Sequence, residues 1–165
     1  DFFEYIDSHL RENGADLAPA FQPMSQNESR LTEAMKSKFY SGIQTEINTQ
    51  GWRKMLLAFD DGKVIGHIDI RPHTENHTSH RALLGMGVDS SYRGNGLGSE
   101  LLSSLFEWAA KNTNIECIDL WVLSSNKPAY LLYEKYGFIN CAEVTDMFRI
   151  DGVSLSYSMM SRQIV

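Results

Sequence analysis

Apolar residues recur with the period of an α-helix in four segments of the chain. These segments predict helices over residues 2–10, 31–47, 99–111 and 128–136. Ser25 and Glu28 have the spacing of a helical capping box, which indicates that the second helix begins near them. The fourth helix has well-marked ends, because Asn126 can cap its start and Gly137 can take the left-handed position after its last turn. A proline-containing loop is expected over residues 17–23.

Apolar and polar residues alternate in most of the remaining segments, as they do in strands. The alternation predicts strands over residues 53–59, 63–70, 81–88, 115–122, 141–150 and 153–160. Asp-Gly pairs predict tight hairpin turns between the first two strands and between the last two. In the second strand Ile68 and Ile70 share one face, whereas His67 and Asp69 share the other.

The order of these elements indicates a mixed α/β sheet with helices packed on it. The 165 residues fit one domain, and there is no repeat, low-complexity tract or linker, so we expect a single domain over residues 1–165. Asp1 is not a methionine, which suggests that the chain given starts inside a longer gene product.

Composition and charge argue against several classes of protein. Hydrophobic residues make up 42% of the chain, as in a globular protein and unlike a disordered one. The 15 basic and 21 acidic residues leave a net charge of −6, which argues against a nucleic-acid surface. No apolar run has the ~20 residues that cross a bilayer, and the first residues do not read as a signal peptide. Cys117 and Cys141 form no CxxC pair and lie in apolar stretches, so we expect them to pack as small hydrophobes in a cytoplasmic protein.

A glycine-rich turn between the third predicted strand and the third predicted helix has the clearest chemistry. Gly94, Gly96 and Gly98 remove side chains there, so backbone N–H groups at a helix start can bind an anion such as a phosphate. Arg93 adds a permanent positive charge beside them. Two phosphate-binding motifs are excluded, because the Lys-Ser/Thr pair of a P-loop is absent and the third glycine comes one residue too early for a dinucleotide fingerprint.

A second motif covers the fourth predicted helix and its ends. It reads Asn-Lys-Pro-Ala-Tyr-Leu-Leu-Tyr-Glu-Lys-Tyr-Gly-Phe over residues 126–138, and the glycine turn reads Arg-Gly-Asn-Gly-Leu-Gly over residues 93–98. Together they resemble the GNAT superfamily of N-acetyltransferases, whose members carry Arg/Gln-x-x-Gly-x-Gly/Ala and then Asn-x-x-Ala-x-x-Leu-Tyr-x-Lys-x-Gly-Phe. The resemblance covers roughly residues 53–160. The superfamily opens with a strand before its first helix, and that strand is expected to be missing from the chain given.

The resemblance implies a mostly antiparallel central sheet in which the strands at 81–88 and 115–122 splay apart, with acetyl-CoA as cosubstrate and no metal. The pantetheine arm of acetyl-CoA is expected to pair with the backbone of the first of these strands, and the pyrophosphate to lie on the glycine turn. The cofactor-binding residues implied are Met86, Gly87, Val88, Arg93, Gly94, Asn95, Gly96, Leu97, Gly98, Ser99 and Asn126. Gly85 and Gly87 suit close approach of a ligand and also a β-bulge, and we regard the two as one feature of this strand.

The implied reaction is the attack of a neutral amine on a thioester. A backbone amide near Val88 can stabilise the oxyanion, and Tyr133 stands at the general-acid position of the second motif. Its reference pKa of about 10 suits protonation of a thiolate. The strand at 81–88 offers no carboxylate from Leu83 onward, so the general base stays open. The candidates are His67, Asp69, His80, Glu46 and ordered water.

The sequence does not identify the acceptor amine. A small molecule such as an amino acid, a polyamine or an aminoglycoside is one interpretation, and the N-terminus or a lysine of a protein is another. A non-catalytic acyl-CoA sensor is a third, which Tyr133 argues against because a sensor needs no acid. We expect acetyl-CoA and an amine as partners, without nucleic acid or membrane, and a homodimer is left open.

Overall fold

The computed structural model describes residues 1–13 and 21–164 of the chain. The α-helices in this part are α1 (Phe2–Arg11), α2 (Glu33–Gln44), α3 (Leu97–Asn112) and α4 (Lys127–Lys135), and a short 3-10 helix, η2 (Ser90–Tyr92), precedes α3. The strands are β1 (Lys54–Asp60), β2 (Lys63–Arg71), β3 (Arg81–Val88), β4 (Cys117–Leu123), β5 (Ile139–Ile150) and β6 (Val153–Gln163). Most of the loop expected at 17–23 lies outside the described residues.

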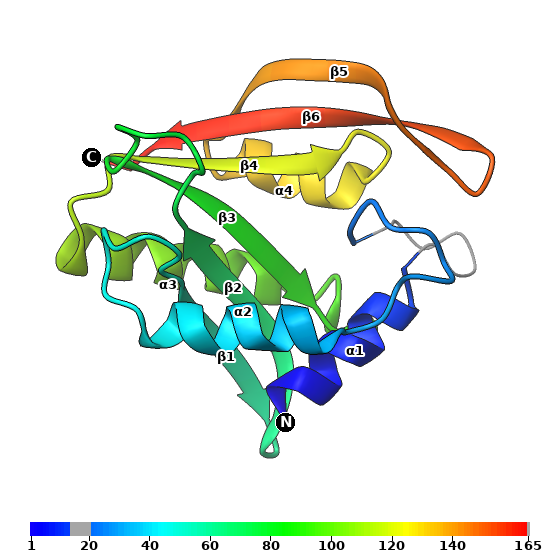
Figure 1. The fold of residues 1–165 in the computed structure, drawn as a ribbon, viewed down its shortest axis with the longest axis horizontal. Helices are drawn as coiled ribbons and strands as arrows, with labels where there is room; N and C mark the ends of the chain where they lie inside the picture. The colour runs from blue at the N-terminus through cyan, green and yellow to red at the C-terminus, as the bar shows by residue number, and fades with distance from the viewer. Residues whose placement is uncertain (14–20, 165) are drawn as a thin grey trace.

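The strands form one sheet in the order β1-β2-β3-β4-β6-β5. Neighbouring strands are antiparallel except for β3 and β4, which are parallel. Helices α1 and α2 cross one face of the sheet, and α3 covers the opposite face of β1, β2 and β3 (Figure 1). The expected fold class, a mixed and mostly antiparallel sheet with flanking helices, is confirmed.

The hydrophobic core lies between the sheet and α3. Alternate residues of β2 and β3, among them Ile68, Ile70 and Leu84, pack against Leu102 and Leu105 of α3, and all five are buried. Full burial of each such side chain contributes about 1.5–3 kcal/mol. This core fixes which face of β2 packs against α3. His67 and Asp69 therefore lie on the opposite face of the sheet, under α1 and α2, as their alternation predicts.

The second helix begins and ends elsewhere than predicted. Ser25 Oγ donates a hydrogen bond to Glu28 at 2.8 Å, but the turn they form does not continue into a helix. Instead Thr32 caps α2, accepting a hydrogen bond from the amide of Met35 at 3.2 Å. The helix ends at Gln44, and Ile43 is exposed, so its apolar stripe is shorter than the periodicity indicates.

A buried ionic cluster joins β3 to β4 at the end where the two strands meet. The Asp119 side chain is fully buried, and Arg81 donates two hydrogen bonds to its carboxylate, at 2.8 and 2.5 Å. His73 Nε2 lies 2.9 Å from the same carboxylate. Burial raises the pKa of Asp119, but the hydrogen bonds with Arg81 and Ser161 outweigh this effect, so the net pKa is lowered.

The two cysteines differ in burial. Cys117 is buried, but Cys141 is exposed on β5, so the prediction that Cys141 packs as a small hydrophobe is wrong.

Candidate functional site

Strands β3 and β4 pair over only part of their length. Their register joins Arg81 to Cys117, Ala82 to Ile118 and Leu83 to Asp119, and beyond that point the strands diverge (Figure 1). A cavity of about 1150 Å³ opens there, lined by β3 from Leu84 to Val88 and by β4 from Trp121 to Leu123. The expected splayed strand pair is confirmed, and the opening is large enough for an extended ligand.

The free edge of β3 presents backbone groups to this cavity. The amide of Asp89 donates to the carbonyl of Ile65 in β2 at 2.9 Å. Because backbone groups alternate sides along an antiparallel pair, the N–H groups of Met86 and Val88 point away from β2 and into the opening. The carbonyl of Val88 accepts a hydrogen bond from Arg93 Nε at 3.0 Å, which leaves its amide and both groups of Met86 available to a ligand.

The glycine turn leads from β3 into α3. Gly94 and Gly96 have φ of 78° and 90°, values that side chains disfavour, and there is open space where a Cβ would stand. Within the described residues, the amides of residues 94–98 have no backbone acceptor, so five N–H groups at a helix start remain free. The amide of Ser99 is already paired, because it donates to the carbonyl of Gly96 at 2.9 Å, and Ser99 lines the cavity.

The structure shows where three other residues of the turn lie and what they contact. Asn95 is not among the residues that line the cavity. At Gly98, a Cβ would lie 2.9 Å from Leu132 of α4, so the glycine lets α3 and α4 pack closely. Arg93 lines the cavity, and its guanidinium also lies 3.5 Å from Glu12, just beyond α1. Arg93 therefore connects the glycine turn to the first helix.

Helix α4 brings Tyr133 to the cavity wall. Asn126 accepts a hydrogen bond from the amide of Ala129 at 3.3 Å and caps the helix as predicted. Tyr133 is buried, and this burial raises its pKa well above the usual value, so the hydroxyl is protonated at neutral pH. Tyr130 and Tyr136, three residues to either side, do not line the cavity in the described part of the chain.

Polar side chains from β2 and α1 lie across the two glycines of β3. A Cβ at Gly85 would stand 2.7 Å from Asp69 Oδ2, and a Cβ at Gly87 would stand 2.8 Å from His67 Cε1. Neither glycine has a positive φ, so space and not backbone conformation accounts for them. There is no register shift between β2 and β3, so the expected β-bulge is absent from this pair.

His9 and Tyr5 of α1 complete the group over Gly87. His9 Nε2 and Tyr5 Oη would each lie 3.1 Å from a Cβ at that position. Burial raises the pKa of Tyr5, so we assign its hydroxyl as the donor to His67 Nδ1, 3.1 Å away. Burial lowers the pKa of His9 to about 4 and that of His67 to about 3, so both imidazoles are neutral at physiological pH. The sequence interpretation missed His9 and Tyr5, although their i,i+4 spacing could have indicated a shared face.

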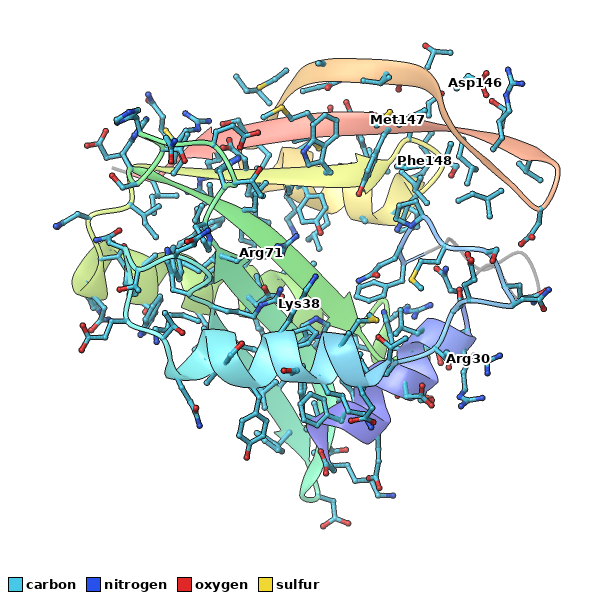
Figure 2. All side chains as sticks on the ribbon, in the orientation of Figure 1. Arg30, Lys38, Arg71, Asp146, Met147 and Phe148 are labelled. Carbon is cyan, nitrogen blue, oxygen red and sulfur yellow. The ribbon has the colours of Figure 1, made fainter. Side chains whose placement is uncertain are left out.

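The part of the cavity under α2 is rich in cations. Arg53, Arg71 and Lys38 line it, and in Figure 2 the labelled side chains of Lys38 and Arg71 lie over the sheet between α2 and β4. The guanidinium of Arg53 stacks 4.0 Å above the ring of Phe39. Among the described lining residues, Asp69 is the one carboxylate. This half of the cavity is positively charged, although the whole chain carries a net charge of −6.

Two of the candidate bases lie elsewhere. His80 and Glu46 are exposed and do not line the cavity in the described part of the chain, whereas His67 and Asp69 do. The described residues hold no group of three or more His, Cys, Asp or Glu side chains that could bind a metal ion. The described helices also include none with the length and apolar character needed to span a membrane.

Comparisons with known proteins agree with this geometry. The model of the acetyltransferase (GNAT) family matches residues 18–138. The L-amino acid N-acetyltransferase AaaT of Escherichia coli is 31% identical over 112 residues, which cover 68% of this chain and 63% of that protein. The human N-acetylaspartate synthetase is 33% identical over 100 residues, which cover 61% of this chain and 32% of that protein. The chain thus spans less than two thirds of either relative.

A solved structure shares the fold across nearly the whole chain. The structure of yncA from Salmonella typhimurium with its cofactor acetyl-CoA superposes with a TM-score of 0.79 at 17% identity. The superposition covers 99% of this chain and 88% of the yncA chain. The splayed strands, the glycine turn at the start of α3 and the family match agree, and we conclude that the chain belongs to the acetyltransferase (GNAT) family.

Proposed function

We propose that the protein transfers the acetyl group of acetyl-CoA to the amine of a small acceptor that also carries an acidic group, of which an amino acid is the simplest example. The observation that carries the acceptor class is the charge of the cavity under α2. Arg53, Arg71 and Lys38 stand there, and Asp69 is the one carboxylate among the described residues that line the cavity. An anionic group on the acceptor would be attracted to this surface, since charge-assisted hydrogen bonds to guanidinium groups are strong and directional.

The same charges disfavour two acceptors that the sequence leaves open. A polyamine or an aminoglycoside carries several positive charges and would be repelled by two guanidinium groups and an ammonium group. The relatives named L-amino acid N-acetyltransferase and N-acetylaspartate synthetase point to the same class of acceptor.

Support for acetyl-CoA as the donor comes from the opening between β3 and β4. The free amides of residues 94–98 can hold the pyrophosphate at the start of α3, and the unpaired backbone of Met86 can bond the pantetheine arm. The fold is shared with a structure that has acetyl-CoA as its cofactor. A bound acyl thioester would then lie between Tyr133 and the polar groups that cover Gly85 and Gly87.

In the proposed reaction the amine nitrogen attacks the thioester carbonyl carbon. The C–N bond forms, the C–S bond breaks, and the Val88 amide stabilises the oxyanion of the tetrahedral intermediate. Tyr133 gives its proton to the departing thiolate, and the nitrogen loses a proton to a base or to water. The products are the N-acetylated acceptor and free CoA.

The test is thiol release from acetyl-CoA with matched sets of acceptors. Each set contains an amino acid, its amide, which keeps the amine but lacks the negative charge, and the corresponding amine without any carboxyl group. We expect turnover with the amino acids and a higher KM with the two uncharged analogues. Equal rates within each set, or a preference for spermidine, would contradict the acceptor class.

A further inference from the structure

Asp69 reaches across the neighbouring strand into the reaction cavity. Its carboxylate belongs to β2, yet Oδ2 occupies the space that a side chain at Gly85 of β3 would need, at 2.7 Å from its Cβ position. Strand β3 itself carries no carboxylate in its last six residues, 83–88. The glycine therefore allows the neighbouring strand to supply an acidic group beside the strand that borders the splayed opening.

The carboxylate of Asp69 is buried but only loosely bound. The nearest atoms of Arg53 and Arg71 are 3.3 and 3.4 Å from Oδ1, and the contact with Arg71 is its one hydrogen bond among the described residues. A buried carboxylate is ordinarily held by several close partners. Asp119 in the same sheet meets that expectation, with contacts of 2.5, 2.8 and 2.9 Å, and it does not line the cavity. Asp69 thus keeps capacity to accept a proton from a ligand.

The pKa values of the two carboxyl groups shift in opposite directions. Burial raises the pKa of Asp69 more than Arg53 and Arg71 lower it, so the net pKa is above the usual value. The net pKa of Asp119 is lowered. A raised pKa makes Asp69 a stronger proton acceptor than an exposed carboxylate.

We propose that Asp69 is the general base for the acceptor amine, and that the acidic group of the acceptor strengthens it by binding Arg53 and Arg71. This inference rests on the proposed function and names the residue that takes the proton. A proton passes from the attacking nitrogen to the Asp69 carboxylate as the C–N bond forms, and Tyr133 protonates the sulfur as the C–S bond breaks. Solvent then returns a proton to Tyr133 and removes one from Asp69, which restores the site.

The charge of the bound acceptor should change the pKa of Asp69. An anionic group bound between Arg53 and Arg71 opposes the two charges that hold the carboxylate ionised, so its pKa rises further. The other titratable or charged groups lining this half of the cavity are His67 from β2, His9 from α1, Lys38 from α2 and Tyr157 from β6. Both imidazoles are neutral, so Lys38 is the other cation that the acceptor can reach.

Asp69→Asn and Gly85→Ala test the role of the carboxylate. Asp69→Asn removes the proton acceptor, whereas Gly85→Ala keeps the charge and displaces it with a methyl group. We expect either change to lower kcat by ~10²–10⁴. The rise in Tm caused by acetyl-CoA should stay as in the wild type, and circular dichroism should show a folded protein. Asp119→Asn is the matched control, since it neutralises a buried carboxylate that does not line the cavity.

The pH dependence separates catalysis from structure. In the wild type, kcat should fall at low pH as Asp69 becomes protonated, and this decline should be absent from Asp69→Asn but present in Asp119→Asn. In the wild type, the decline in kcat should also occur at a higher pH with an amino acid as acceptor than with its amide. Asp69→Asn should abolish this difference between the two acceptors. If Asp69→Asn keeps both the rate and the low-pH decline, Asp69 is not the base, although the proposed function stands. If the wild type neither binds acetyl-CoA nor releases thiol, the proposed function itself fails.

Discussion

Replacing Arg81 by methionine removes the guanidinium from the buried cluster that joins β3 to β4, and keeps most of the apolar stem. The change leaves Asp119 fully buried, and among the described residues His73 and Ser161 remain as its hydrogen-bond partners. Removing one partner of a buried ion pair costs ~3–5 kcal/mol, since the other charge loses its compensation. The Arg81 side chain is 29% exposed, so we expect the lower end, about 3 kcal/mol.

The expected loss is large enough to measure by thermal unfolding. For a domain of this size, 1 kcal/mol corresponds to a change of about 2–4 °C in Tm, so Arg81→Met should lower Tm by about 6–12 °C. Arg149→Met provides the control, because Arg149 and Asp146 also form an ion pair, with atoms 2.6 Å apart, but the Arg149 side chain is 80% exposed. We expect no measurable change in Tm for that variant.

The loss should also depend on pH. The folded-state pKa of Asp119 lies below its unfolded value, so its charge stabilises the fold above about pH 4, and this contribution disappears as pH falls further. The difference in unfolding free energy between wild type and Arg81→Met should therefore be full at neutral pH and shrink below about pH 4. Equal Tm losses in Arg81→Met and Arg149→Met, or a difference that grows on acidification, would refute the reasoning.

Three further predictions concern the cavity. Tyr133→Phe should lower kcat by ~10²–10⁴ with little change in CoA affinity, whereas Tyr136→Phe should retain turnover; full activity of the first variant would exclude Tyr133 as the acid. Acetyl-CoA at a hundred times its Kd should stabilise the wild type by about 2.7 kcal/mol. Gly96→Val should lose that shift, and Gly62→Val, with a similar positive φ in the β1–β2 turn, should keep it; retention by both would contradict the phosphate site. Arg71→Gln should raise KM about 10- to 100-fold for an amino acid but not for its amide, and equal changes would argue against carboxylate recognition.

Features set by local chemistry could be predicted from the sequence. The ends of α4 are explained by the cap at Asn126 and the left-handed Gly137, and both hairpins are explained by their Asp-Gly turns. The predicted start of α2 was wrong because Ser25 and Glu28 form a local hydrogen bond that a turn can satisfy without a helix. A capping pattern indicates a favourable local bond, but it does not establish that a helix continues beyond that bond.

Features set by packing between distant segments could not be predicted. His9 reaches the cavity because α1 crosses β2 and β3, which places residues 9 and 87 together. The glycine pair of β3 was noticed, but the sequence does not say which side chains take the space that the glycines leave. Likewise, Cys141 lies in an apolar stretch and is nevertheless exposed, because β5 is the outer strand of the sheet.

The two glycines of β3 have a consequence for how such a site can change during evolution. At Gly85 and Gly87 the strand contributes only its main chain, and the chemically active groups above it belong to β2 and α1. Substitutions at positions 9 or 67 can therefore change the side chains that cover β3 without altering any backbone atom of that strand. Under the proposed function, the side chains that choose the acceptor can change in evolution while the backbone that binds the donor stays the same.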